Sequence, residues 1–337
     1  MILLTYGTRP EYIKIKPLID EMSKRNIPFK TLSTGQHKDI APNDADFNLD
    51  FKDYGGNRLD SVMKNCLSIP DKVFDGIDYI LVQGDTTSVV GLSLTALHRK
   101  IKLIHLEAGL RSFDTKNPFP EENNRKIVST IADIHLCPTL QNMYNLWDEN
   151  ISPDKTYLVG NTVLDNLLPY KDECEYTNKV LVTMHRRENH NNMDEWFFHI
   201  NELAKQNKHL EFIIPLHPNP NVQKHKKILT DVKIINPIDH DELIKLLVKC
   251  KIVITDSGGI QEECSFFNKK CLVCRKVTER PESVGLTSFM VDSPSNLIKV
   301  FNEHIKSYDL NIVSPYGDGY SSQKICDVLK DYIKNKL

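Results

Sequence analysis

The chain has 337 residues, which is long for one doubly wound domain and enough for two. Its 43 basic and 45 acidic residues leave a net charge of −2, which gives no reason to expect a basic stripe for nucleic acid or a cationic patch for an anionic membrane. Hydrophobic residues make up 40% and charged residues 26%, as in ordinary globular proteins, and we expect no nucleic-acid partner and no membrane insertion.

The first residues, Met1 to Gly7, form a short apolar run that ends in glycine. No basic segment accompanies this run, and it is too short to span a bilayer. We interpret it as a buried first strand without an export signal, and we expect a cytoplasmic protein.

Short apolar runs alternate with longer amphipathic stretches along nearly the whole chain. Val, Ile and Leu dominate several of these runs, as in strands that are covered on both faces of a sheet. The alternation predicts parallel sheets built from βαβ units. The predicted strands cover residues 2–6, 29–33, 79–83, 102–106, 134–137 and 156–159, and then residues 180–184, 210–216, 232–236, 252–255, 271–274 and 289–291.

The two sets of strands predict an α/β fold with two Rossmann-like, doubly wound parallel-sheet domains, over residues 1–164 and 165–319. A helix over about 320–337 is expected to pack back onto the first domain. Residues 41–57 contain few apolar anchors and are expected to form a long loop. Ligands of open α/β sheets bind beyond the carboxyl ends of the strands, so we expect the ligand in a cleft between the two domains.

Gly7-Thr8-Arg9-Pro10-Glu11 follows the first predicted strand and precedes a helix that begins near Pro10. Backbone N–H groups at a helix N-terminus suit a phosphate, and the guanidinium of Arg9 adds a fixed fork of donors. A plain strand–turn–helix with an exposed arginine explains the same residues equally well.

Three carboxylates follow in the first half of the chain. Asp85 comes after the third strand, where aspartate is commonly a helix N-cap, and Glu107 comes after the fourth. Glu121 opens the next helix, and its spacing from Arg125 also suits a surface i,i+4 salt bridge. Because such positions meet at one edge of a parallel sheet, the three carboxylates are expected to converge.

The second half carries a complementary set of residues. His185 and His217 each follow a predicted strand, although single histidines at such places are often structural or exposed. A buried strand, the turn Ser257-Gly258-Gly259 and a helix make a seat for a pyrophosphate, because glycine lets oxygens approach the backbone amides. Glu263 on that helix is placed to reach ribose hydroxyls, and Arg280 lies downstream. A purely structural turn is the alternative.

Several motifs are missing from the sequence. No Gly-x-Gly-x-x-Gly follows the first strand, and neither a P-loop sequence nor His-Glu-x-x-His occurs. Cys271 and Cys274 form the one Cys-x-x-Cys pair, without a second pair at zinc-ligand spacing. We therefore expect no cofactor and no metal, and we interpret the eight cysteines as buried free thiols.

Ten short motifs occur in one order over almost the whole chain. They are GTRPE at 7–11, TGQH at 34–37, QGDTT at 83–87, HLEAGLRS at 105–112, NPFPEENNR at 117–125, GNTVLD at 160–165, HRREN at 185–189, DSGGIQEE at 256–263, TERPE at 278–282 and PYGDG at 315–319. Together they resemble the motifs of the non-hydrolysing UDP-N-acetylglucosamine 2-epimerases. One such motif is weak evidence, but ten in the family's order are highly specific.

The resemblance implies a GT-B-like isomerase that holds a UDP-linked N-acetylhexosamine between two Rossmann-like domains, and it suggests a homodimer. The implied reaction interconverts UDP-N-acetylglucosamine and UDP-N-acetylmannosamine. It proceeds by anti elimination of UDP to a 2-acetamidoglucal, followed by re-addition from the other face. Such chemistry needs a base near C2 and cations or amides around the departing diphosphate.

Matching the motifs position by position implies roles for single residues. Asp85, Glu107 and Glu121 match the catalytic carboxylates of the family, and we hypothesise that Asp85 removes the C2 proton. His185 is expected both to act in catalysis and to hold the diphosphate. The remaining implied binding residues are Arg9, Ser257 and Gly258 at the diphosphate, Gly259 in the turn, Glu263 at the ribose, Arg280 near the sugar-phosphate, and Lys14, Arg125 and His217 at other cleft positions.

Many bacterial members of the family use a second UDP-N-acetylglucosamine as an allosteric activator, held partly by the Gln-His of the TGQH motif. Gln36 and His37 are present here. Residues 38–43 depart from the usual helical pattern, and Gly55-Gly56 stands where an activator-binding arginine is expected. The resemblance therefore does not predict activation for this chain.

Alternative functions remain open at this point. A 2-epimerase of a C6-oxidised or deoxygenated UDP-N-acetylhexosamine would carry the same motifs. A GT-B glycosyltransferase shares the fold and the phosphate-binding turn but needs an acceptor channel. A hydrolysing epimerase would lack the Arg-Pro-Glu continuation of the first motif, and a catalytically inactive sensor would not need three intact carboxylates.

Overall fold

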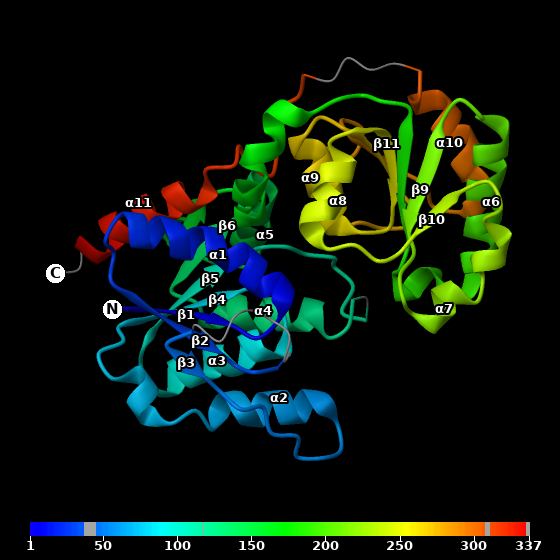
Figure 1. Cartoon of the computed structure of the whole chain (residues 1–337). Coiled ribbons are helices and arrows are strands. Elements are labelled where there is room, and N and C mark those ends of the chain that lie inside the picture. Colours follow the sequence, from blue (N-terminus) through cyan, green and yellow to red (C-terminus); the bar gives the residue numbers. More distant parts are fainter. Residues whose placement is uncertain (37–44, 117, 307–310, 335–337) are drawn as a thin grey trace. The chain divides into compact units, whose positions relative to one another are not determined.

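The computed structural model describes residues 1–36, 45–116, 118–306 and 311–334, and the chain divides into two compact units (Figure 1). Unit 1 consists of Met1–Asn166 and Gly317–Leu337, and unit 2 consists of Leu167–Tyr316. Each unit contains one sheet of parallel strands with helices connecting them. The structure therefore confirms the predicted α/β class with two Rossmann-like parallel sheets.

The sheet of unit 1 has seven strands in the order β3-β2-β1-β4-β5-β6-β7, and the neighbouring strands run parallel. The strand order reverses between β1 and β4, so the carboxyl ends of these two strands flank the topological switch point, where ligands of such sheets bind. The strands are β1 Ile2–Tyr6, β2 Phe29–Ser33, β3 Phe47–Asn48, β4 Tyr79–Gln83, β5 Lys102–Leu106, β6 Ile134–Cys137 and β7 Thr156–Leu158, and the helices are α1 Arg9–Lys24, α2 Arg58–Leu67, α3 Thr87–His98, α4 Glu121–Ile131, α5 Leu140–Asp148 and α11 Ser321–Lys334.

Successive side chains of β1 pack on opposite faces of the unit 1 sheet. Ile2 and Leu4 pack with Leu18 of α1 and Leu329 of α11 on one face. Leu3 packs on the other face, in a cluster that includes residues of α3. Because both faces are covered, β1 is buried along its whole length rather than on alternate residues, as its mostly apolar sequence predicts. The C-terminal helix α11 lies beside α1 (Figure 1).

The sheet of unit 2 has six strands in the order β10-β9-β8-β11-β12-β13. Its order reverses between β8 and β11, and these strands are parallel neighbours. The strands are β8 Lys179–Thr183, β9 Glu211–Pro215, β10 Lys233–Ile235, β11 Cys250–Thr255, β12 Lys270–Val273 and β13 Ser288–Met290, and the helices are α6 Met193–Gln206, α7 Pro220–Gln223, α8 His240–Leu247, α9 Gly258–Phe266 and α10 Leu297–His304.

Two aromatic residues of α6 dominate the core of unit 2. Trp196 and Phe197 are buried against β8, β9 and β11, together with Phe301 of α10. The indole N–H of Trp196 donates to Oδ1 of Asn189 at 3.2 Å, so the one polar atom of this side chain is satisfied. Short 3-10 segments complete the chain at Asp71–Phe74, Pro153–Lys155, Thr162–Glu173, Arg187–Asn192, Lys226–Ile228, Pro281–Ser283 and Pro294–Asn296.

Residues 41–57 were predicted to form a long loop. Within the described part of this segment, the prediction is wrong at residues 47–48. Phe47 and Asn48 form the edge strand β3, which pairs with Leu32 and Ser33 of β2. The side chain of Asp46 anchors this strand, because its Oδ2 accepts from the backbone N–H of Thr31 at 2.7 Å. Two residues are too few to produce a hydrophobic period. His37 and residues 38–43 lie outside the described residues.

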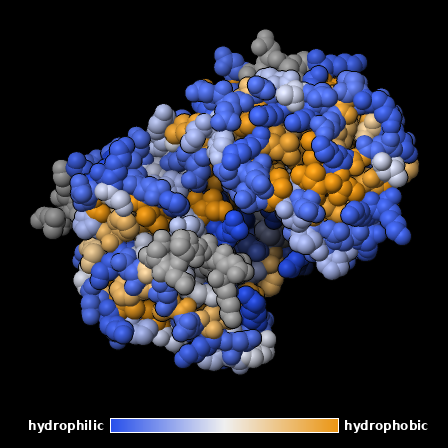
Figure 2. Space-filling view, viewed as in Figure 1, coloured by the Kyte–Doolittle hydropathy of each residue, from blue (hydrophilic) through white to orange (hydrophobic). Residues whose placement is uncertain are grey.

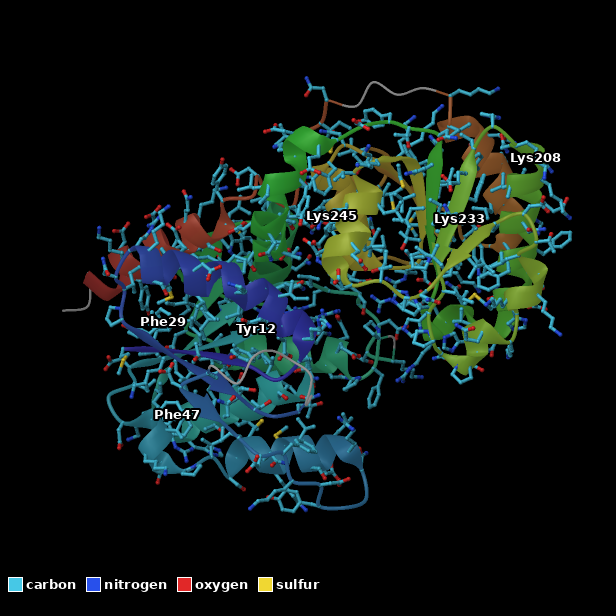
Figure 3. The ribbon with its side chains drawn as sticks, in the orientation of Figure 1. Tyr12, Phe29, Phe47, Lys208, Lys233 and Lys245 are labelled. Atoms are coloured by element: carbon cyan, nitrogen blue, oxygen red, sulfur yellow. The ribbon has the colours of Figure 1, made fainter. Side chains whose placement is uncertain are left out.

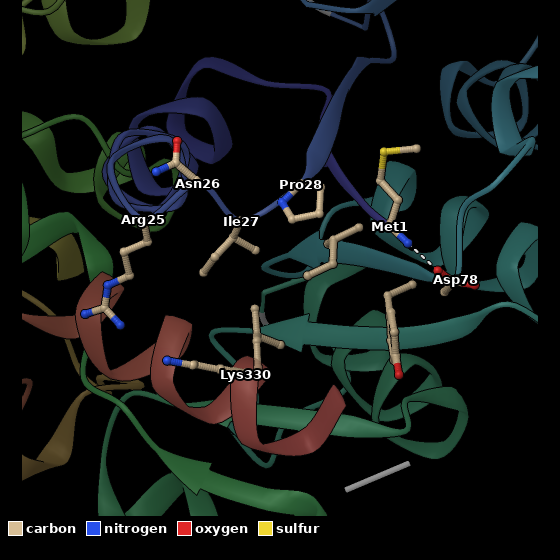
Figure 4. Close-up of a pocket in the computed structure, with 10 residues that line it drawn as sticks. Met1, Arg25, Asn26, Ile27, Pro28, Asp78 and Lys330 are labelled. Carbon is tan, nitrogen blue, oxygen red and sulfur yellow. Dashed lines mark hydrogen bonds and ion pairs between the residues drawn. The ribbon is translucent and has the colours of Figure 1, made fainter. Parts of the chain in front are cut away.

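A cavity of about 540 Å³ lies at the amino-terminal ends of β1 and β4 in unit 1 (Figure 4). Ile2 and Tyr79, the first residues of these strands, line it together with Leu329 of α11. At its rim the N-terminal ammonium pairs with Asp78. Because ligands of open α/β sheets bind beyond the carboxyl ends of the strands, this cavity lies at the opposite edge from the predicted site.

Hydrophilic side chains cover much of the visible surface of each unit, with apolar areas between them (Figure 2). In unit 2, Lys233 pairs with Glu211 at 2.7 Å, and Lys208 pairs with Asp231; both lysines are labelled in Figure 3. Within the described residues, the structure contains no helix with the length and apolar character needed to cross a membrane.

Candidate active site

The N-terminus of α1 supplies its own anion. Thr8 is the N-cap, and its hydroxyl accepts from the backbone N–H of Glu11. In return Oε2 of Glu11 accepts from the N–H groups of Gly7 at 2.6 Å and Thr8 at 3.0 Å. A capping box therefore occupies the amides of Gly7 and Thr8, and the predicted role of Arg9 in binding a diphosphate stays a prediction. Arg9 is exposed, and no hydrogen bond or ion pair connects it to another described residue.

Glu11 also connects this turn to the end of β4. Its Oε1 accepts from the hydroxyl of Thr86 at 2.7 Å, and the side chain is buried. Burial raises the pKa of Glu11 above its ordinary value, although the hydrogen bonds from Thr86, Gly7 and Thr8 oppose that shift. Glu11 was not predicted as a site residue, although it is the last residue of the GTRPE motif, and that motif was the signal that could have identified it.

Asp85, at the end of β4, is held by Arg125 of α4. Nε and Nη2 of Arg125 contact Oδ2 of Asp85 at 2.9 and 2.8 Å. The amide of Asn124 donates to the backbone carbonyl of Asp85 at 2.8 Å. The N-cap of α3 is Thr86, so the alternative that Asp85 caps this helix is wrong. Oδ1 of Asp85 has no hydrogen bond or ion pair to another described residue.

Glu107, at the end of β5, has a left-handed backbone with φ of 65°, which is uncommon for a residue other than glycine. Its Oε2 accepts from Nζ of Lys14 at 2.5 Å and from the side-chain amide of Gln83. The Lys14 ammonium and the Gln83 amide come from α1 and β4, so two other elements fix this carboxylate at the end of β5. Backbone strain of this kind often marks functional positions.

The two neighbouring glutamates at the start of α4 differ in their surroundings. Glu122 is fully buried and accepts from the N–H groups of Ser112 at 2.9 Å and Phe113 at 3.1 Å, and from Nη1 of Arg125 at 2.9 Å. Oε2 of Glu121 is buried without a hydrogen-bond partner in the described part of the chain. The alternative of a surface salt bridge between Glu121 and Arg125 is wrong: Arg125 binds Asp85 and Glu122 instead.

Unit 1 thus brings the predicted residues together as two ion pairs. Asp85 is joined to Arg125, and Glu107 is joined to Lys14, all at the carboxyl-end edge of the sheet. Glu121 and Arg9 belong to the same edge without such a pairing. Glu122 and Glu11, which sequence reasoning did not single out, hold the framework in place.

In unit 2, the buried carboxylate of Asp256 organises the loop after β8. Its oxygens accept from the backbone N–H groups of His185 at 3.0 Å and Arg186 at 2.9 Å, and from the amide of Asn189 at 3.1 Å. The ring of His185 stacks on that of His217, with centroids 5.4 Å apart and 18° between the planes. Burial lowers the pKa of His185, while the negative charge of Asp256 opposes that shift.

The helix α9 begins directly after β11 and presents its first amides at the switch point of the unit 2 sheet. Ser257 is the N-cap, but its side chain makes no capping hydrogen bond. A Cβ on Gly258 would lie 2.6 Å from Nη1 of Arg280, whereas a Cβ on Gly259 would meet nothing closer than 3.9 Å. Gly258 is therefore required by packing, and Gly259 leaves open space where an anion can approach the helix N-terminus.

Arg280 belongs to a network of buried charges. Its Nη1 donates to Glu279 at 2.6 Å, and its Nε donates to Glu262. Glu279 also accepts from Arg275 at 2.7 Å. Although burial favours the neutral form, Arg280 and Arg275 hold the pKa of Glu279 well below its usual range. Arg280 thus supports the first turn of α9 through Gly258, and its predicted contact with the ligand stays a prediction.

Glu263 lies one turn beyond Gly259 on α9. Its Oε1 is 2.7 Å from Nε2 of His240, the first residue of α8. Its Oε2 is buried and has no hydrogen-bond partner among the described residues. His240 was not predicted from the sequence, since a single histidine at the start of a helix carries no recognisable signal.

Within the described residues, no group of three or more His, Cys, Asp or Glu side chains could hold a metal ion. The cysteines are free thiols, and Cys271 and Cys274 are both buried in or beside β12. Burial raises the pKa of Cys274 well above its ordinary value, which makes it a poor nucleophile and a poor metal ligand.

Comparisons of the sequence and of the structure with known proteins find similar proteins of one family over nearly the whole chain. The profile of the UDP-N-acetylglucosamine 2-epimerase family matches residues 20–330. A UDP-N-acetylglucosamine 2-epimerase of Campylobacter jejuni is 36% identical, over 97% of this chain and 97% of that protein. The crystal structure of the Neisseria meningitidis enzyme bound to UDP-GlcNAc matches with a TM-score of 0.87 and 35% identity, covering 98% of this chain and 99% of that one. The Methanocaldococcus jannaschii enzyme in complex with UDP-GlcNAc and UDP matches with a TM-score of 0.79 and 29% identity, covering 98% and 99%.

Proposed function

The chain belongs to the UDP-N-acetylglucosamine 2-epimerase family, and from that premise we propose that this isomerase interconverts UDP-N-acetylglucosamine and UDP-N-acetylmannosamine. One observation of the site supports this reaction above the others. Asp85 is fixed by Arg125 through Oδ2 alone, so Oδ1 is oriented and open to a substrate proton. A general base needs this combination of fixed geometry and one open acceptor.

The C2 proton of the sugar is not adjacent to a carbonyl group, so a base alone cannot remove it easily. It leaves as the bond between C1 and the diphosphate oxygen breaks, which gives a 2-acetamidoglucal and UDP. Re-addition of UDP at C1, with a proton delivered to the opposite face of C2, produces the epimer. In the elimination the base gains one proton from C2, and in the re-addition a second acid gives one proton to C2. Proton exchange of these two groups with solvent then returns both to their starting states, so atoms balance.

The three carboxylates of unit 1 suit these proton transfers. We assign removal of the C2 proton to Asp85, and delivery or positioning of the second proton to Glu107 and Glu121. Glu107 is held by Lys14 at 2.5 Å, which fixes its orientation. Oε2 of Glu121 is a buried acceptor without a partner among the described residues, and a substrate hydroxyl or proton would satisfy it.

The residues of unit 2 suit the UDP part of the substrate. Amides at the start of α9 offer hydrogen bonds to a diphosphate, and the helix dipole favours its negative charge. We propose that Ser257, Gly258 and Gly259 contribute this turn and that Glu263 binds the ribose. His185 and His217 stack beside the end of β8, and we propose that His185 contacts the departing diphosphate. Arg9 and Arg280 are proposed to add positive charge.

Proton NMR in heavy water with purified protein and UDP-N-acetylglucosamine tests this reaction. We expect the anomeric signal of UDP-N-acetylmannosamine to appear and deuterium to enter C2 in both sugars. Free N-acetylmannosamine would instead indicate a hydrolysing enzyme. Absence of both product and exchange would overturn the proposed substrate, and the same experiment with the C6-oxidised and deoxygenated donors would then identify the sugar.

Two further properties are proposed from the family alone. We propose that the protein acts in the cytoplasm and that it forms a homodimer. Sedimentation equilibrium of the purified chain would decide the second point, since a dimer has twice the monomer mass of 38.8 kDa.

A further inference from the structure

Glu263 carries a buried carboxylate oxygen that the protein itself does not satisfy. The side chain is only 5% exposed, and Oε2 has no hydrogen-bond partner among the described residues. An acceptor buried without a partner is unfavourable, and native proteins normally provide a partner by protein, water or ligand. The open oxygen therefore indicates a hydroxyl or N–H donor that arrives from outside the chain.

Glu263 and Gly259 lie on the same face of α9. They are four residues apart, so one side chain stands about 6 Å along the axis from the other. The space next to Gly259 is open, since a Cβ there would meet no atom closer than 3.9 Å. A ligand whose anionic group sits at the helix N-terminus would therefore bring its next polar groups to Glu263.

His240 fixes the rotation of the Glu263 carboxylate. Its Nε2 lies 2.7 Å from Oε1, and because a carboxylate only accepts, this nitrogen carries the hydrogen. Without this contact the carboxylate could turn about its last side-chain bond and exchange its two oxygens. With Oε1 held by His240, Oε2 points in one fixed direction. Oε1 can still accept from a second donor through its remaining lone pair.

The start of α8 is itself well anchored, so His240 is a firm support. The carboxylate of Asp239 caps the helix by accepting from the backbone N–H of Glu242 at 2.9 Å. Asp241 accepts from Nζ of Lys245 at 2.5 Å and from the hydroxyl of Tyr170. His240 lies between these two anchored residues, and its side chain is 32% exposed.

We propose that His240 is a positioning residue that orients Glu263 to accept from both hydroxyls of a vicinal diol, and that this pair selects a ribonucleotide over a deoxyribonucleotide. The inference rests on the proposed function, because it takes the UDP moiety as the ligand of α9. A carboxylate that is free to rotate must lose that freedom to accept from both hydroxyls at once. A carboxylate held by His240 is already oriented for both, and it loses more affinity when either hydroxyl is removed.

Isothermal titration calorimetry of the full chain tests this with UDP, 2′-deoxy-UDP and 3′-deoxy-UDP. We expect the wild-type protein to prefer UDP over at least one deoxy analogue by about tenfold, the range of one hydrogen bond to a charged group. In His240→Ala we expect affinity for UDP to fall about tenfold and this preference to approach one. His240→Gln, whose side-chain N–H can replace Nε2–H, is expected to restore most of the preference.

The ratio of the affinities for UDP and for a deoxy analogue distinguishes loss of a positioning contact from loss of folded protein. Partial unfolding lowers the affinity for every nucleotide by the same factor and leaves this ratio unchanged. His209→Ala, which removes an exposed histidine of the same unit, is the matched control and is expected to bind like wild type. An unchanged preference in His240→Ala, or a wild-type protein that binds UDP and both analogues equally, would overturn the role of His240. A wild-type protein that does not bind UDP would instead contradict the proposed function.

Discussion

Nε and Nη2 of Arg125 both contact Oδ2 of Asp85, at 2.9 and 2.8 Å, so one guanidinium fixes one oxygen of this carboxylate and leaves the other open. The remaining nitrogen, Nη1, binds the buried Glu122 at 2.9 Å. Arg125 therefore connects the end of β4 to the first turn of α4 and to the loop that Glu122 holds. A planar fork is needed, because the contacts to Asp85 and to Glu122 point in two different directions from one guanidinium.

We predict that Arg125→Lys lowers kcat by about 100-fold, since an ammonium is a point charge and misplaced catalytic groups cost about that factor. Arg125→Ala should also lose about 3 kcal/mol of unfolding free energy, because it leaves Glu122 buried without its cation. Steady-state kinetics and urea unfolding measure the two effects. Lys126→Ala, on the exposed side of α4, is the control. Wild-type kcat in Arg125→Lys would contradict the positioning role.

Asp85→Asn is predicted to slow deuterium exchange at C2 by about 10³-fold, in the range of general-base catalysis. The amide oxygen can still accept from Arg125, so the affinity for UDP should stay unchanged. NMR exchange and calorimetry are the two measurements, with the exposed Asp75→Asn as the matched control. If the exchange rate survives in Asp85→Asn, the proton is removed by another group, and Glu107 or Glu121 is then the base.

The two glycines at the start of α9 are predicted to respond differently to alanine. In Gly258→Ala the new methyl group meets Nη1 of Arg280 at 2.6 Å, and that guanidinium is held by two carboxylates. We expect a loss of about 1–3 kcal/mol in stability, as for overpacking. Gly259→Ala has room and should keep its Tm, while its methyl group weakens UDP binding. A lowered Tm in Gly259→Ala with unchanged affinity would contradict this distinction.

His135 makes the stability of the folded chain sensitive to acid. It is fully buried in β6 and aligned with His105 of β5, and neither of its ring nitrogens has a partner among the described residues. Burial lowers the pKa of His135 to about 3 and that of His105 to about 4, from an ordinary value of 6.5. Below pH 6.5 the unfolded chain binds protons that the folded chain does not, so stability falls as the pH falls towards 4.

We predict that His135→Phe raises Tm more at pH 5 than at pH 8. The gain that depends on pH amounts to about 2 kcal/mol at pH 5, the cost of keeping one such histidine neutral. Thermal unfolding at the two pH values measures it, and the exposed His209→Ala should show no such difference. Any overpacking by the phenyl ring is the same at both pH values, so an equal change in Tm at pH 5 and pH 8 would refute the prediction.

Much of the fold could be predicted because buried parallel strands are continuous apolar runs. Residues 2–6 and 79–83 were predicted as strands, and the structure has β1 and β4 at these positions. In unit 2, β12 and β13 begin at Lys270 and Ser288, one residue before the predicted starts. Backbone pairing defines a strand, and polar residues at its end take part without contributing to the apolar pattern.

The site was harder to predict where one side chain depends on another. The positions of Asp85, Glu107 and Glu263 follow from strand ends and helix periodicity. The sequence spacing of Glu121 and Arg125 suggested a pair, yet Arg125 binds Glu122 and Asp85. Sequence spacing shows which carboxylates on α4 lie within reach of Arg125. Which of them Arg125 binds is decided by burial, and Glu122 is the buried one. Asp256 depends on contacts with the loop after β8, and His240 on a contact with α9, and no local pattern encodes either.

The capping box at α1 has a consequence for how the protein responds to salt. Because Glu11 already occupies the amides of Gly7 and Thr8, a phosphate near this helix would meet a neutralised N-terminus and could be held only by the exposed charge of Arg9. Attraction to an exposed charge is screened within about 8 Å at physiological ionic strength. Amides at the start of α9, in contrast, bind by short directional contacts. Added salt should therefore weaken the contribution of Arg9 to nucleotide binding and leave that of α9 largely intact.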